Sequence, residues 1–211
     1  VGAYQHPSPV GTMTTSSGPR LREEDVTRLL LGLFEKLPAW LIEHRRTHEA
    51  LPGSRHHDDD QVASPFLVSS AAHHALTHAV DHLACLHSTV AKAGDLPMAA
   101  PFTLMRGTIE NAATAVWLMQ PDDQTERIRR RLQLALSDVG DCEAVERLGA
   151  AATGRPPSEM RAKIAEIGDS VGLPRDVVLG RGSRLARIVH EARAVLPRGG
   201  AQVDCVWRLR S

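Results

Sequence analysis

The sequence predicts an all-α fold, an antiparallel helical bundle with a disordered N-terminal arm. Apolar residues recur at helical spacing along most of the chain, as at Leu132, Ala135 and Val139. No segment of useful length alternates apolar and polar residues as a half-buried strand would, and no internal repeat is present. A chain of 211 residues suits one domain, so we expect an arm at 1–20 and a single bundle domain at 21–211.

The first expected elements follow from composition and proline positions. Residues 1–20 are rich in Gly, Pro, Ser and Thr, which is typical of disorder. A helix is expected over 23–51, with a kink or break at Pro38, because proline removes a backbone hydrogen bond. The polar segment at 52–61 is expected to be a loop, and 64–92 to be the second helix.

Four more helices are expected in the second half of the chain. Pro101 suits the first turn of a helix over 101–120. Acidic residues favour a helix N-terminus, so Asp122 and Asp123 are expected to open a fourth helix that reaches Leu148. Ser158 is the expected cap of a fifth helix. The fifth and sixth helices are expected over 158–171 and 183–196, and the bundle is expected to join the second, third, fourth and sixth helices.

Charge and aromatic content bear on nucleic-acid binding. The 25 Lys and Arg residues equal the 25 Asp and Glu residues, so the net charge is zero. This balance argues against binding of nucleic acid through a broad positive surface. RNA could then bind only at local basic patches. Aromatic residues make up 3% of the chain, too few for a platform that stacks single-stranded bases.

Cysteine spacing and hydropathy indicate a cytoplasmic protein. Cys85, Cys142 and Cys205 lie far apart without a C-x-x-C motif, so we expect buried thiols and neither a disulfide framework nor a zinc ribbon. No apolar run reaches the roughly eighteen residues of a membrane span, so no membrane partner is expected. The first twenty residues lack the apolar core of a signal peptide.

Both ends of the chain are unusual. The sequence begins at Val1 with Met13 downstream, and it stops at Ser211 within WRLRS. We therefore expect the bundle domain to be truncated at its C-terminus.

Arg106 and Glu110 lie four residues apart in the third expected helix, which is apolar almost all round. A helix with so little polar surface is expected to be buried, where a charged pair is costly unless its members bind each other. One interpretation is a structural contact with Asp81 or His82 of the second helix. The other is a polar cluster that holds a phosphate or activates a water molecule. Asn111 could hydrogen-bond across the bundle.

Histidines follow one face of the second expected helix. An arc of roughly 100° contains His74, His78, Asp81, His82 and Cys85. The spacing His-x-x-x-His allows two imidazoles to share a metal ion, so His74, His78 and His82 are alternative metal ligands. Glu110 or Asp81 could then act as the base. The other interpretations are a solvated or hydrogen-bonding face and a pH-sensitive interface.

A dense basic turn opens the fourth expected helix. Arg127, Arg129, Arg130 and Arg131 could meet RNA phosphates, or they could form a solvated face answered by acidic residues. The segment RHHDDD at 55–60 could catch a cation, although adjacent polar residues in a loop are usually solvated. No Gly-rich loop follows a strand, so no nucleotide-binding motif is present.

Three segments carry a resemblance to a known family. ALTHAVDHLACL at 75–86, APFTLMRGTIENAATAVWLM at 100–119 and ERIRRRLQLALSDV at 126–139 resemble an uncharacterised family of helical bacterial proteins, common in actinobacteria. That family is similar to the HEPN-like helical domains. Its R-x-x-x-E-N segment is the most specific part of the match, which covers about a third of the chain.

The resemblance implies a ribonuclease-type site and a homodimer. Many HEPN domains cleave RNA with an Arg and a His that meet across a dimer. Trp207, Arg208 and Ser211 match the start of the family's Trp-Arg-x-x-Ser segment, but the Ala-His pair that follows there lies beyond the last residue of this chain. In HEPN ribonucleases this Arg and His lie four to six residues apart. Arg184 and His190, with five residues between them, resemble that spacing within the chain.

The leading hypothesis is a cytoplasmic, HEPN-like binding or assembly module with an incomplete ribonuclease-type site. Its polar centre would contain Arg106, Glu110 and Arg208, and no cofactor is implied. The alternative is a metal-dependent helical-bundle enzyme that uses the histidine face of the second helix. A purely structural helical domain is the third interpretation, for which the sequence offers no distinctive motif.

Overall fold

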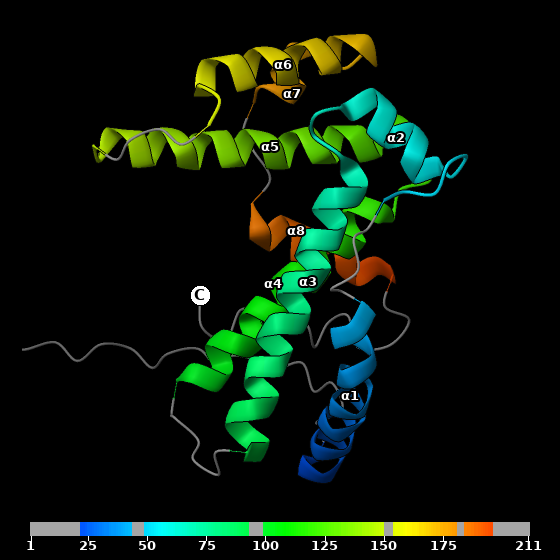
Figure 1. Ribbon diagram of the computed structural model, residues 1–211, viewed down its shortest axis with the longest axis vertical. Helices are drawn as coiled ribbons and strands as arrows, with labels where there is room; N and C mark the ends of the chain where they lie inside the picture. The colour runs from blue at the N-terminus through cyan, green and yellow to red at the C-terminus, as the bar shows by residue number, and fades with distance from the viewer. Residues whose placement is uncertain (1–21, 44–48, 93–98, 150–153, 181–183, 196–211) are drawn as a thin grey trace, which may run out of the picture. The chain divides into compact units, whose positions relative to one another are not determined.

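The computed structural model describes residues 22–43, 49–92, 99–149, 154–180 and 184–195. Every regular element in these ranges is helical, which confirms the all-α prediction (Figure 1). The α-helices are α1 (Glu23–Glu43), α2 (Arg55–Ala63), α3 (Val68–His87), α4 (Ala100–Met119), α5 (Gln124–Arg147), α6 (Pro157–Ser170), α7 (Arg175–Val178) and α8 (Leu185–Ala192). The π-helix η1 (Ser88–Lys92) follows α3, and the 3-10 helix η2 (Arg193–Val195) follows α8.

The chain divides into two compact units, Val1–Lys36 and Leu37–Ser211. In the first unit, Asp25 of α1 pairs with Arg22 and Arg28. The expected arm at 1–20 lies outside the described residues. Helix α1 continues through Pro38, so this proline does not divide it.

Helix α2 replaces the loop expected at 52–61. The Ser54 hydroxyl caps it by accepting a hydrogen bond of 3.2 Å from the His57 backbone N–H. Asp58 lies in the first turn, where a negative charge is favourable. The helix has almost no apolar period and buries only Asp59 and Ala63. Capping and tertiary contacts therefore explain this element better than amphipathicity does.

Later elements also differ in detail from the expectation. Pro156 occupies the N-cap position of α6, with proline again at the first helical position, so Ser158 is not the cap. Helix α7 lies between the fifth and sixth expected helices, where no helix was expected. Helix α8 spans only Leu185–Ala192 of the sixth expected helix, and η2 continues it.

The first hydrophobic core joins α2, α5, α6 and α7 with the turn before α3 and with Val68, the first residue of α3. Helices α5 and α6 lie side by side (Figure 1). Burial of these apolar side chains is the main force that holds the four helices together. Its buried members are Ala63, Phe66, Val68, Ile128, Leu132, Ala135, Leu136, Val139, Ile164, Ile167 and Val178.

The second core joins α3, α4 and α8. Helices α3 and α4 are antiparallel, since His82 lies against Gly107 and Ala72 shares a core with Trp117. Leu134 of α5 also packs against this core. Its buried members are Ala72, Ala113, Trp117, Leu118, Ile188, Val189 and Ala192. With two cores on α5, the arrangement as one antiparallel bundle is not confirmed.

Gly168 is required where α7 packs on α6. A Cβ atom at this position would lie 2.7 Å from Cγ2 of Val178, a β-branched residue that is only 1% exposed and has little room to move. We expect Gly168→Ala to lower the free energy of unfolding by roughly 1–3 kcal/mol, as overpacking does. Urea denaturation followed by circular dichroism measures this change.

Gly140 of α5 provides the matched control. A Cβ atom there would meet nothing within 4 Å. Gly140→Ala should therefore raise the free energy of unfolding by roughly 0.5–1 kcal/mol, because alanine loses less backbone entropy in a helix. Similar changes in the two variants would contradict the packing argument for Gly168.

Candidate functional site

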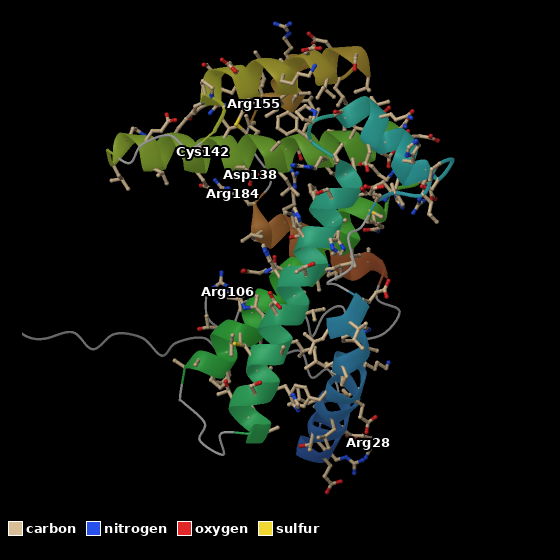
Figure 2. All side chains as sticks on the ribbon, viewed as in Figure 1. Arg28, Arg106, Asp138, Cys142, Arg155 and Arg184 are labelled. Atoms are coloured by element: carbon tan, nitrogen blue, oxygen red, sulfur yellow. The ribbon has the colours of Figure 1, made fainter. Side chains whose placement is uncertain are left out.

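Arg106 and Glu110 do form the predicted ion pair, with Nε and Oε1 2.8 Å apart. The Arg106 side chain, labelled in Figure 2, is nevertheless partly exposed. Its exposed fraction is 40%, and that of the Glu110 side chain is 18%. The predicted burial is therefore wrong. A partly exposed pair at this spacing keeps contact with water and contributes only about 0.3–0.5 kcal/mol, so its presence no longer requires a site. The buried residues of α4 are only Pro101, Ala113, Ala115, Trp117 and Leu118.

Of the other members of the predicted polar cluster, His82 packs at the α3–α4 contact. The His82 imidazole packs directly against Gly107. A Cβ atom added at Gly107 would lie only 2.7 Å from Cδ2 of His82. The Asn111 amide does not reach across to another helix, because Nδ2 donates to the Gly107 carbonyl at 2.8 Å within α4. Asp81 is exposed, and Arg208 lies outside the described residues.

The histidine face of α3 does not assemble a metal site in the described part of the chain. His74 and His78 are exposed, and His82 is half-buried. No three His, Cys, Asp or Glu side chains among the described residues are placed to hold a metal ion. Cys85 and Cys142 are exposed, which corrects the expectation of buried thiols. Cys205 lies outside the described residues.

A buried ion pair joins α2 to α5. Arg127 donates from Nε to Asp59 Oδ2 at 2.6 Å and from Nη2 to Asp59 Oδ1 at 2.9 Å. Its Nη1 donates to the carbonyls of Pro121 and Asp122 at 2.8 and 2.7 Å. Asp59 is 0% exposed and Arg127 is 2% exposed. Donation of these hydrogen bonds to the Asp59 carboxylate raises the pKa of Arg127 above its usual value, so the guanidinium keeps its positive charge.

The neighbouring arginines also bind the protein itself. Arg129 donates to both carboxylate oxygens of Glu126 at 2.5 Å, and Arg130 donates to Oε1 of the same residue at 2.7 Å. The Arg130 Nη1 donates to the Trp117 carbonyl at 2.6 Å, and its guanidinium lies 4.9 Å from the centroid of that indole. Arg131 donates from Nε to the Leu67 carbonyl at 3.2 Å. The basic turn is therefore an internal scaffold, which the sequence interpretations missed.

His56 makes stability depend on pH. Its Nδ1 lies 3.5 Å from Asp59 Oδ2, but burial and the charge of Arg55 outweigh that carboxylate and lower the pKa of His56 below 6.5. The unfolded chain therefore binds this proton more tightly than the folded chain does. We expect the free energy of unfolding to fall as the pH drops from 6.5 through the lowered pKa.

Urea denaturation at pH values from 8 down to about 4.5, across the range where histidine titrates, measures this dependence. His56→Gln should flatten the profile below neutral pH. The matched control is His190→Gln, because His190 is exposed on α8, and this variant should keep the wild-type profile. A parallel fall in His56→Gln and in the unsubstituted chain would contradict the assignment.

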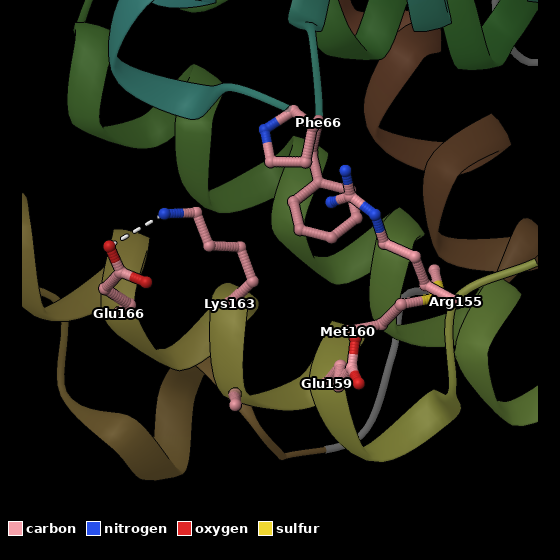
Figure 3. Close-up of a pocket in the computed structure, with 8 residues that line it drawn as sticks. Phe66, Arg155, Glu159, Met160, Lys163 and Glu166 are labelled. Atoms are coloured by element: carbon pink, nitrogen blue, oxygen red, sulfur yellow. Dashed lines mark hydrogen bonds and ion pairs between the residues drawn. The ribbon is translucent and has the colours of Figure 1, made fainter.

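A cavity of about 600 Å³ opens between the turn at 64–67 and α6 (Figure 3). Phe66 is 8% exposed and belongs to the first core, and Met160 packs against that core. Lys163 donates from Nζ to Glu166 Oε1 at 2.7 Å. Nothing in the sequence spacing indicated this cavity, since its walls come from segments about ninety residues apart. It is lined by Pro65, Phe66, Arg155, Glu159, Met160, Ala162, Lys163 and Glu166.

Comparison with known proteins adds no family to this picture. No family model, curated protein or solved structure matches the chain. The HEPN-like resemblance, the homodimer and RNA binding therefore remain predictions. None of the helices in the described ranges has the length and hydropathy needed to cross a membrane.

Proposed function

We propose that this chain is a cytoplasmic helical binding module whose ligand occupies the cavity between the turn at 64–67 and α6. The cavity itself carries the proposal. Binding sites for small molecules are typically concavities of about 300–1,000 Å³ with mainly apolar walls and a few polar groups. The volume of about 600 Å³, with Phe66 and Met160 as walls and charged side chains around them, fits that description.

The walls of the cavity are anchored by the first core. Phe66 is a buried member of that core, and Met160 packs against it. A preformed wall lowers the entropic cost of binding, because little side-chain freedom is lost when the ligand enters. This anchoring favours a binding role for the cavity over a surface depression without function.

The candidate catalytic residues give less support to an enzyme. Arg106 and Glu110 are partly exposed, and Arg208 lies outside the described residues. Arg127, which was expected only as a possible contact for RNA phosphate, is committed to Asp59 and two backbone carbonyls. In this proposal the ribonuclease-type site is therefore incomplete, and no catalytic role is assigned to it. No observation favours the metal-dependent alternative.

Titration with indole tests the proposal. Indole is a neutral aromatic probe, and its expected dissociation constant is on the order of 1 mM for a fragment of this size. Amide chemical shifts of the ¹⁵N-labelled chain should change around Phe66, Met160 and Ala162. Saturable shifts at these positions would support the proposal, and their absence at several millimolar indole would overturn it.

A blocking variant makes the test specific. Ala162 is an exposed position of α6 that lines the cavity, so Ala162→Trp should fill the space and abolish the shifts. The matched control is Ala39→Trp, because Ala39 is an exposed helical alanine that does not line the cavity. Equal binding by the two variants would contradict the assignment of the site.

A further inference from the structure

Two cationic groups approach the Phe66 ring that forms one wall of the cavity. The Arg131 guanidinium carbon of α5 lies 5.7 Å from the ring centroid. The Arg155 side chain, just before α6, extends toward the same ring (Figure 3). A cation near the face of an aromatic ring is attracted by the negative end of the ring's quadrupole.

Among the charged side chains that line the cavity, Arg155 is the cation that a ligand can reach. Lys163 is already paired with Glu166 at 2.7 Å. The Glu159 carboxylate lies beside α6 and not beside the Phe66 ring (Figure 3). Arg155 is exposed and makes no ion pair with any residue that the structure describes. An incoming anion that stacks on Phe66 would thus meet the Arg155 guanidinium before any carboxylate.

We propose that the ligand of this cavity is a small aromatic acid, with its ring against Phe66 and its carboxylate on Arg155. The inference rests on the proposed binding function and adds the chemical class. Arginine suits this role because its planar guanidinium can donate two parallel hydrogen bonds to a carboxylate. The apolar walls favour the ring over a fully hydrated ion. One open guanidinium matches one negative charge.

Three probes of similar shape and different charge show how much the charge of the ligand contributes to its affinity. They are 3-phenylpropionate, the neutral 3-phenylpropan-1-ol and the cationic 3-phenylpropylamine, each titrated into the ¹⁵N-labelled chain at low ionic strength. We expect the acid to bind about 2- to 5-fold more tightly than the alcohol, as a partly exposed ion pair allows. The amine should bind most weakly. Added salt should narrow the difference between acid and alcohol, because it screens exposed charges.

Arg155→Gln tests the assigned residue. This variant should bind the acid and the alcohol equally, with the affinity for the alcohol unchanged. The matched control is Arg184→Gln, because Arg184 is an exposed arginine that does not line the cavity (Figure 2). The control should keep the preference for the acid. Circular dichroism of both variants checks that they fold as the unsubstituted chain does.

The possible outcomes distinguish a failure of this inference from a failure of the proposed binding function. If none of the three probes shifts the resonances around Phe66 and Met160, the proposed binding function fails and the inference fails with it. If the alcohol or the amine binds as tightly as the acid, the binding function stands and the aromatic-acid assignment is wrong. If Arg155→Gln keeps the preference for the acid, the role of Arg155 is overturned.

Discussion

Replacing Asp59 with leucine is expected to lower the free energy of unfolding by about 3–5 kcal/mol, the usual result of breaking a buried ion pair. The Arg127 guanidinium would remain only 2% exposed and would lose the carboxylate that accepts from its Nε and Nη2. Two backbone carbonyls would be its only remaining partners in the described residues. Urea denaturation monitored by circular dichroism gives the change in unfolding free energy.

An exposed pair supplies the control. Arg175 binds Asp169 at 2.7 Å, with side chains that are 71% and 45% exposed. Arg175→Met should change stability very little, because the Asp169 carboxylate that remains is exposed and stays hydrated. A loss in Asp59→Leu no larger than in this control would show that water reaches Arg127 in the folded chain.

The double variant Asp59→Leu with Arg127→Met distinguishes the loss of the ion pair from the cost of leaving Arg127 charged and buried. Removing both charges leaves no uncompensated ion, so most of the stability lost in Asp59→Leu should return. Recovery should be incomplete, because the carbonyls of Pro121 and Asp122 lose their donor. Losses that simply add in the double variant would contradict direct coupling between the two side chains.

The sequence predicted α3, α4 and α5 well because apolar periodicity determines them. The expected bounds of α4 and α5 differ from the observed ones by one or two residues at each end. Helix α2 was missed for the opposite reason. Its segment RHHDDDQVA has only two apolar residues, so the Ser54 cap and the contact of Asp59 with Arg127 specify it. A cap followed by acidic residues was a local signal that could have indicated a helix.

The candidate site was harder to predict than the helices. Sequence spacing correctly paired Arg106 with Glu110, since residues four apart face each other on a helix. Their exposure depends on which elements cover α4, and spacing carries no information about that. The cavity depends on the packing of Phe66 against α6. Such a contact between distant segments is a tertiary property without a local sequence signature.

Trp117→Ala is expected to lower the free energy of unfolding by about 3–5 kcal/mol, as for other large-to-small changes of buried aromatic residues. The indole is 0% exposed within the second core, where it shares burial with Ile188 and Val189 of α8. Removing it would leave a cavity that the surrounding helices can close only in part. Denaturation with urea measures the loss, and the amide signals of α8 should report it first, since this short helix depends on that core.

Two milder variants identify which property of Trp117 matters. Its Nε1–H donates to Glu191 Oε2 at 2.7 Å, but the Glu191 side chain is 35% exposed and can return to water. Trp117→Phe loses this hydrogen bond and part of the volume, so about 1–2 kcal/mol should be lost. Glu191→Gln keeps an acceptor oxygen and should cost still less. If Trp117→Phe proved as damaging as Trp117→Ala, the hydrogen bond to α8, and not burial of the ring, would dominate this core.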